Sequence, residues 1–355
     1  MAYTTVDNPE LYFQSVLWTG DDSTDNAITF DNTDTSMQPD LIWLKPRTKV
    51  DNHRWMDSVR GVTKMLPSNS DGVEETISAG LASFDSNGFT LNTTDNGYNS
   101  SSYTYVAWSW KAGTAFSNDA SSTGIGSIDS SGSVNETAGF SIVSYTGSGS
   151  AATVKHGLST TPNMMIIKNR VTSTKDWQVY SPVNDPTDAL ALNQSDATGD
   201  SNVYWNDTAP TSSVFSVHSG ATNTSGAATI GYIFSNRQGF SKFGTYGGSG
   251  NLDGPMIYTG FSPAFVILKR TNSSNHWIMF DNKRDPHNEA IGTLYPNTTV
   301  VEDRGTGAND IDFLSNGFKI REDNGECNGD GDSYIYMAFA QQPFVTSTGV
   351  PATAR

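Results

Sequence analysis

The chain has a single cysteine, Cys327, among its 355 residues, so an intramolecular disulfide framework is excluded. No segment approaches the roughly 20 consecutive apolar residues that a membrane-spanning helix requires, so we expect no membrane insertion. The N-terminal sequence MAYTTVDNPE has neither a basic region nor an apolar run, which predicts synthesis in a cytoplasm without a signal peptide. Packing alone must then stabilise the fold.

Basic residues are also scarce. The chain has 21 Lys and Arg against 37 Asp and Glu, which gives a formal net charge of −16. Affinity for nucleic acid comes mostly from Lys and Arg on phosphates, so this balance argues against a nucleic-acid partner. It favours solubility and self-repulsion instead.

Recognisable catalytic patterns are missing as well. The five histidines form no H-x-x-x-H or H-E-x-x-H pair, and Cys327 has no partner at metal-ligand spacing. The chain has neither a G-x-S-x-G elbow nor a phosphate-binding G-x-x-x-x-G-K loop. The sequence therefore predicts that the protein is not an enzyme and has no cofactor.

What the sequence has is short runs of aromatic and β-branched residues broken by Gly, Asn, Asp and Ser, a pattern typical of an all-β protein. The best candidate for a helix is the short segment 71–84. A Ser/Gly/Asn/Thr-rich stretch without periodicity, residues 113–137, is typical of a flexible linker. The C-terminal PFVTSTGVPATAR is expected to be extended, because its prolines discourage helix.

Several segments recur in one order, which predicts an internal repeat. The matching phrases are PDLIWLKPR, PNMMIIKNR and SPAFVILKR, then RWMDS, WQVYS and WIMFD, then YVAWSW, IGYIF and YIYMAF. The offsets agree, since Lys45 and Lys168 lie 123 residues apart and Trp55 and Trp177 lie 122 apart. Before these phrases, YFQSVLWTG, GFSIVSYTG and GFSKFGTYGG occupy matching places as first strands.

We therefore predict three tandem copies of a β-sandwich-like (jelly-roll-like) unit of about 100 residues. The predicted organisation is repeat one over residues 1–112, the linker over 113–137, repeat two over 138–238, and repeat three with the extended tail over 239–355. The runs LIWL, MMII and FVIL do not alternate, so each is expected to be a strand covered on both faces.

Basic residues and tryptophans recur beside these strands and form a candidate binding set. Its members are Lys45, Arg47, Trp55, Lys168, Arg170, Trp177, Lys269, Arg270 and Trp277. As a functional site they would form a cationic rim with aromatic anchors for a sugar or an acidic partner. The alternative is that the cations end buried strands and pair with local carboxylates, and that the tryptophans are core. Asp57, three residues before Arg60, and Asp281, three before Arg284, are natural carboxylate candidates. We favour this structural alternative for the basic residues and for each tryptophan taken alone.

Two acidic clusters are candidate calcium sites, because Ca²⁺ binds oxygen ligands. The segment DNGECNGDGD, with Asp323, Asp330 and Asp332, is the best candidate, and DDSTDNAITFDNTD at 21–34 is a second. Neither has EF-hand spacing, so solvated turns are the favoured interpretation and a Ca²⁺ site is the alternative.

Several phrases resemble an uncharacterised family of structural, tail-fibre-like proteins of tailed bacteriophages of marine bacteria. These phrases are DNPELYFQ, MQPDLIW, DSVRGVTK, GFSIVSYTGSGSAATVKHGL and YMAFAQQPFVTSTGVPATAR, and together they span nearly the whole chain. A lysine at Lys155, where a neutral residue is expected, is a small departure. The resemblance implies a virion component and brings no catalytic residues with it.

We therefore expect a non-enzymatic virion protein, most simply a tail fibre, spike or appendage component that contacts a glycan or protein receptor on the host surface. Two alternatives are a decoration protein on the capsid and a free carbohydrate-binding or adhesive protein. The expected partners are other virion proteins, a host-surface glycan and further copies of the chain. By analogy with phage appendages the assembly is a homotrimer, and the alternative is a single chain with pseudo-threefold symmetry.

Overall fold

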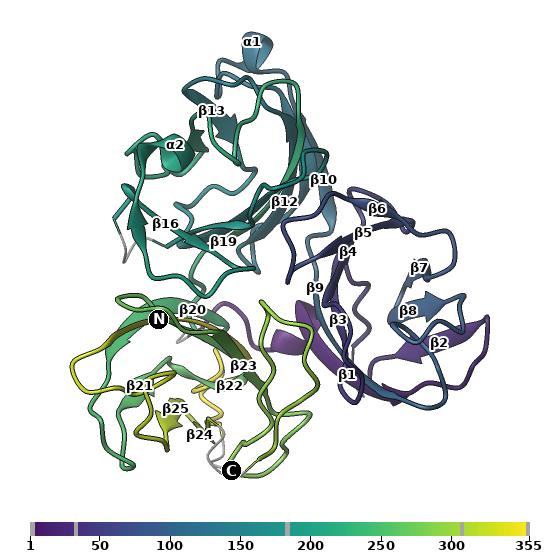
Figure 1. The fold of residues 1–355 in the computed structure, drawn as a ribbon, viewed down its shortest axis with the longest axis vertical. Helices are drawn as coiled ribbons and strands as arrows, with labels where there is room; N and C mark the ends of the chain where they lie inside the picture. Colours follow the sequence, from purple (N-terminus) through teal and green to yellow (C-terminus); the bar gives the residue numbers. More distant parts are fainter. Residues whose placement is uncertain (1–3, 32–34, 182–184, 306–308, 353–355) are drawn as a thin grey trace.

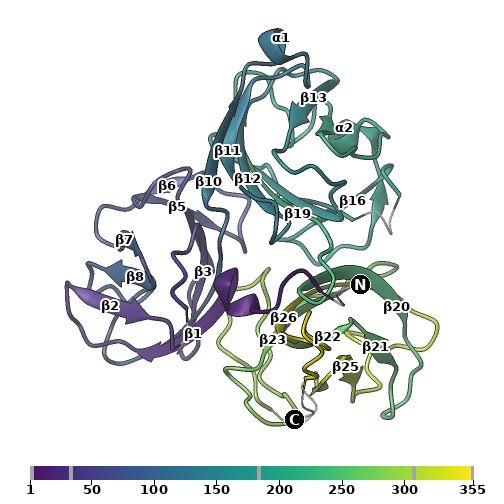
Figure 2. The same cartoon turned by 180° about the vertical axis from the view of Figure 1, so that it is seen from behind.

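The computed structural model describes residues 4–31, 35–181, 185–305 and 309–352. Strands make up 42% of the chain and helices 3%, so the all-β prediction is confirmed. Figure 1 shows three β lobes arranged around a common centre, and Figure 2 shows the same arrangement from behind. Within the described ranges, no helix is both long enough and apolar enough to cross a membrane.

The first lobe pairs a main sheet with a smaller one. In the main sheet the order is β1 (Phe13–Thr19), β9 (Thr104–Trp110), β3 (Leu41–Pro46), β4 (Arg54–Asp57), β5 (Lys64–Pro67) and β6 (Glu75–Thr76). In the smaller sheet it is β2 (Asn26–Thr29), β8 (Gly88–Leu91) and β7 (Leu81–Asp85). A 3-10 turn, η1 (Pro9–Leu11), precedes β1.

The second lobe has the same plan with two extra strands at one edge. Its main sheet runs β10 (Thr114–Asn118), β11 (Ser130–Asn135), β12 (Phe140–Thr146), β19 (Ala228–Phe234), β14 (Met164–Asn169), β15 (Gln178–Tyr180), β16 (Asp188–Ala191) and β17 (Gly199–Asp200). The smaller sheet is β13 (Ala152–Lys155) with β18 (Val214–Val217), and two short helices are α1 (Ala120–Thr123) and α2 (Asn202–Trp205).

The third lobe has the fewest strands among the described residues. Its main sheet runs β20 (Ser241–Gly247), β26 (Ser333–Pro343), β22 (Phe261–Arg270) and β23 (Trp277–Asp281). Its smaller sheet runs β21 (Met256–Tyr258), β25 (Gly317–Ile320) and β24 (Ile311–Leu314). In every lobe the strand that comes last in the chain pairs with two neighbours in the main sheet. Thus β9 lies between β1 and β3, β19 lies between β12 and β14, and β26 lies between β20 and β22.

The strands β3, β14 and β22 are buried on both faces, as their unbroken apolar runs predict. In β3, Ile42 and Leu44 face the interior of the first lobe, whereas Leu41 and Trp43 belong to a core shared by all three lobes. We call this shared cluster the central core. Side chains alternate across a strand, so one run can fill two different cores.

Three aromatic rings from the last strands meet in the central core. Trp110 of β9, Phe234 of β19 and Phe339 of β26 lie with ring centroids 6.4, 5.5 and 5.9 Å apart. These separations are favourable for aromatic pairs, and each ring is almost completely buried. The lobes are therefore joined through a hydrophobic core rather than tethered by loops.

Three local expectations are wrong. Residues 113–137 are not a flexible linker, because β11 pairs with the edge of β12 and β10 pairs with β11, so both strands extend the second lobe's sheet. Backbone pairing at a sheet edge does not require apolar side chains, so the polar composition of this segment did not indicate its strands. Segment 71–84 is not helical: it holds β6 and the start of β7, and the Glu74 N–H is bonded to the second lobe. Over the described residues 343–352 the tail folds back on itself instead of running extended, since the Ala352 N–H donates to the Phe344 carbonyl; residues 353–355 lie outside the described part of the chain.

Candidate functional site

The candidate lysines and tryptophans, together with Arg47 and Arg170, lie where one lobe meets the next. Each lobe has a segment that we call its arm: residues 67–74 at the end of β5, residues 191–198 at the end of β16, and residues 295–302 after β23. The first arm contacts the second lobe, the second arm contacts the third lobe, and the third arm contacts the first lobe. The contacts thus close a ring within one chain.

The tryptophans pack into these junctions. Trp177 Nε1 donates to the Pro67 carbonyl of the first arm, and Trp277 Nε1 donates to Ala191 at the start of the second arm, both at 2.9 Å. Trp55 packs against Trp177 with the rings tilted and their centroids 5.1 Å apart, and its Nε1 has no hydrogen-bond partner in the described part of the chain. None of the three is more than 3% exposed, so they are core residues, as the favoured interpretation of each one held, and the alternative of surface anchors is wrong.

The recurring lysines are fully buried, each with its ammonium group among backbone carbonyls. Lys45 Nζ donates to the carbonyls of Lys49, Asp51 and, across the junction, Thr299 (2.9–3.3 Å). Lys168 Nζ reaches Asp71 of the first arm, and Lys269 Nζ reaches Ser195 of the second arm.

Because carbonyl dipoles replace water only in part, burial penalises the charged form of these lysines. It lowers the pKa of Lys45 to about 7 and the pKa values of Lys168 and Lys269 to about 8. The cationic rim is therefore wrong: at 0% exposure, the lysines cannot meet an acidic partner.

Two arginines form paired hydrogen bonds with glutamates of neighbouring arms. Arg47 donates through Nε and Nη2 to Glu302 at 2.6 and 3.1 Å, and Arg170 donates likewise to Glu74 at 2.8 and 2.9 Å. Arg–carboxylate pairs of this bidentate kind are among the stronger polar contacts. Their partners are distant in sequence, so the expectation of local carboxylates is wrong for them.

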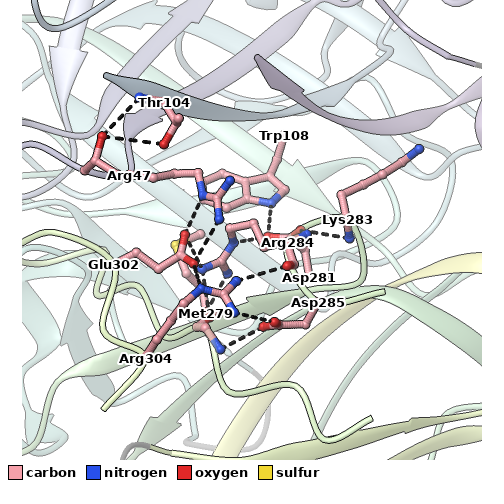
Figure 3. A network of polar contacts seen from close by, with 12 residues as sticks. Arg47, Thr104, Trp108, Met279, Asp281, Lys283, Arg284, Asp285, Glu302 and Arg304 are labelled. Carbon is pink, nitrogen blue, oxygen red and sulfur yellow. Dashed lines mark hydrogen bonds and ion pairs between the residues drawn. The ribbon is translucent and has the colours of Figure 1, made fainter. Parts of the chain in front are cut away.

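Glu302 forms ion pairs with three arginines at the junction between the third and first lobes. Figure 3 shows it between Arg47, Arg284 and Arg304. Burial opposes ionisation, but the hydrogen bond from Arg47 and the charges of the three guanidinium groups outweigh it. The pKa of Glu302 is lowered to about 2.

The two local pairs that the sequence suggested do form. Asp57 Oδ2 accepts from Arg60 Nε, and Asp281 Oδ2 accepts from Arg284 Nε, at 2.5 Å with all four side chains fully buried. Each aspartate also accepts from an adjacent lobe, Asp57 from the Tyr232 hydroxyl (2.7 Å) and Asp281 from Trp108 Nε1 (3.0 Å; Figure 3). Sequence reasoning missed these two donors, because no spacing links them to the aspartates.

The junction between the second and third lobes differs. Counting from the buried lysine, the place of Arg47 and Arg170 is taken by Thr271, so Arg270 is not their counterpart. The place of the glutamate is taken by Thr198, whose hydroxyl donates to the Thr271 carbonyl at 2.9 Å. Arg270 instead pairs with Asp332 of its own lobe at 2.5 Å.

The structure does not assemble the proposed calcium ligands. Asp323, Asp330 and Asp332 form no ligand group, and across the described ranges no three His, Cys, Asp or Glu residues are placed to hold a metal. Asp332 Oδ1 already accepts from Arg270 and from Asn272 Nδ2 at 3.2 Å.

Comparison with known proteins gives one match. Residues 8–343 match the family described as Domain of unknown function (DUF7483), and the chain therefore belongs to that family. No curated protein and no solved structure matches the chain.

Proposed function

We propose that this DUF7483 protein is a non-enzymatic structural component of a tailed-phage virion, serving in a tail fibre or spike that contacts the host surface. The observation that carries the proposal is how the chain uses its buried charges. The buried lysines and the Arg–Glu pairs are all engaged in joining one lobe to the next. The phage assignment itself rests on the sequence resemblance.

The non-enzymatic part of the proposal follows from the environment of these groups. A catalytic acid or base must meet a substrate in an accessible site. Asp57 and Asp281 are fully buried and hold arginine ion pairs, and the lysines are enclosed by carbonyl groups. Such groups stabilise a shape and do not reach a ligand.

We also propose that the three lobes are copies of one unit, as the recurring phrases predict. A repeated aromatic contact supports this in addition to the shared strand order. Trp18 Nε1, the Tyr145 hydroxyl and the Tyr246 hydroxyl, at matching places in the three lobes, each donate to a main-chain carbonyl. The three acceptors are Tyr98, Thr222 and Cys327, and each directly precedes a buried asparagine: Asn99, Asn223 or Asn328.

Capsid decoration is the second candidate, and the ring supports it. Three lobes around one core make a body without a shaft, which could sit directly on a lattice position of threefold character. One chain already supplies three lobes, so a monomer could fill such a position alone. The homotrimer therefore stays a prediction. Sedimentation velocity at micromolar concentration separates a 38.2 kDa monomer from a trimer.

Antibody labelling of intact virions, seen by electron microscopy, tests the proposal. Label on the tail tip or fibres supports the appendage role, whereas label over the head supports decoration. No label on virions, with binding of the purified protein to envelope glycans, would indicate a free carbohydrate-binding protein. Release of soluble products from host envelope would overturn the non-enzymatic claim.

A further inference from the structure

A cavity of about 480 Å³ opens beside the junction between the third and first lobes, with the third arm as one wall. Its lining combines an aromatic ring, two valines and carboxylates: Tyr295, Val300, Val301, Asp303 and Glu326. Cavities of this size are typical of sites that take a small ligand or one protruding side chain with its backbone.

The apolar wall is exposed, yet its backbone is held in place. Val300 is 43% and Val301 38% exposed, which is unusual for valine beside a packed junction. The adjacent Thr299 carbonyl accepts from both Lys45 Nζ and the Asp51 N–H of the first lobe. The Tyr295 ring packs edge-on against His276 at 5.2 Å. The surface is therefore preformed.

The carboxylates in the lining differ in how their charge is used. Glu302 is offset by three arginines, as described above. Asp303 Oδ1 accepts from the Gly305 N–H, and Glu326 Oε2 accepts from Asn309 Nδ2. Neither forms an ion pair with a lysine or arginine of the described residues, so the cavity keeps negative charge beside an apolar wall.

We propose that this cavity binds an arginine or lysine side chain of a protein partner. Such a side chain has an apolar stem and a charged end, which matches the two valines and the two carboxylates. The Tyr295 ring adds a face on which a cation can rest. The chain's net charge of −16 favours approach of a basic partner and disfavours anionic ligands.

This inference does not depend on the virion assignment. A structural protein of any particle can carry such a contact, and failure of the contact would leave the location of the protein untouched. The competing ligand class is a neutral saccharide, which could stack on Tyr295 and donate hydroxyls to the same carboxylates.

The test uses the full chain with a fluorescein-labelled tetra-arginine peptide, followed by fluorescence anisotropy at physiological ionic strength. Tetra-glutamine is the charge control and chitotetraose, measured by calorimetry, is the saccharide probe. The double variant Asp303→Asn/Glu326→Gln removes the charge of the cavity. The matched control is Asp196→Asn/Asp200→Asn, which removes two negative charges from the second lobe, away from the cavity.

We expect tetra-arginine to bind more tightly than tetra-glutamine, and the cavity double variant to weaken it about tenfold, with little change in the matched control. Val301→Ser should weaken binding several-fold, whereas Val171→Ser, at another exposed valine, should not. Equal losses in both double variants would show non-specific attraction and overturn the proposal. So would absence of tetra-arginine binding, or chitotetraose binding that the cavity variant abolishes.

Discussion

Two junctions of the ring are ionic, whereas the described residues form no ion pair between the arm and the neighbouring lobe at the third. Between the first and second lobes, and between the third and first, an arginine and a glutamate meet in paired hydrogen bonds over a buried Asp–Arg pair. Between the second and third lobes, Thr198 and Thr271 stand in the corresponding places.

The backbone is the same at all three junctions. Glu302 N–H donates to the Arg47 carbonyl, Glu74 N–H to the Arg170 carbonyl and Thr198 N–H to the Thr271 carbonyl, at 2.8, 2.8 and 2.9 Å. A buried lysine bonds to each arm as well. Backbone contacts, the buried lysines and the central core therefore hold the ring together, and ion pairs add to it where both partners are present.

The largest effect should come from Asp281→Ala. The substitution removes the carboxylate nearest to buried Arg284, which keeps only the more distant Glu302, and it leaves Trp108 Nε1 without its acceptor. Breaking a buried ion pair by removing one partner costs about 3–5 kcal/mol. Urea unfolding followed by tryptophan fluorescence measures the loss. The matched control Thr198→Ala, at the uncharged junction, should lose about 1 kcal/mol or less. Similar losses at both positions would mean that the ionic and uncharged junctions do not differ in strength.

Acid should weaken the ionic junctions selectively. The pKa of Glu302 is about 2 in the folded chain and near 4.5 when unfolded, so its stabilisation is complete above pH 4.5. It is lost progressively as the pH falls from 4.5 through 2. Glu302→Gln lacks this titration, and its free energy of unfolding should fall less steeply over that window. Parallel pH profiles for the two proteins would contradict the assignment.

How much of this was predictable depends on whether an interaction is local. The unbroken run LIWL was sufficient to predict a strand with two buried faces, and Asp57 and Arg60 were close enough in sequence to be paired. The cross-junction partners were not predictable: Glu302 lies 255 residues from Arg47, and the fold alone brings them together. The carbonyl groups that the recurring lysines reach in the arms were equally unpredictable, because no sequence pattern indicates that an arm contacts the next lobe. The sequence even predicts a helix for part of the first arm.

The junction between the first and second lobes can be given the uncharged residues of the junction between the second and third. Replacing Arg170 and Glu74 by threonine copies the pair at the other junction, and a double-mutant cycle isolates their coupling. Arg170 and Glu74 are 18% and 10% exposed, so water screens the pair and the coupling should be about 1 kcal/mol. Arg60 loses one partner in the Glu74 variant but keeps Asp57. A coupling near zero would show that the bidentate pair contributes nothing measurable.

The smallest effect should come from Thr198→Val. It removes one hydroxyl that donates to the Thr271 carbonyl, while the backbone bond between the same residues remains. We expect a loss of about 0.5–1 kcal/mol in the free energy of unfolding. Thr348→Val, in the exposed C-terminal tail, serves as the control and should change little. A loss of several kcal/mol would mean that the uncharged junction depends on this one hydroxyl.

Differential scanning calorimetry of the full chain shows whether the three lobes unfold as one body. If the junctions and the central core make the three lobes one body, the chain should unfold in one cooperative transition, with calorimetric and van't Hoff enthalpies nearly equal. Asp281→Ala should lower the transition temperature without dividing the transition. Three resolved transitions, or a calorimetric enthalpy about three times the van't Hoff value, would show lobes that fold independently and would contradict the account.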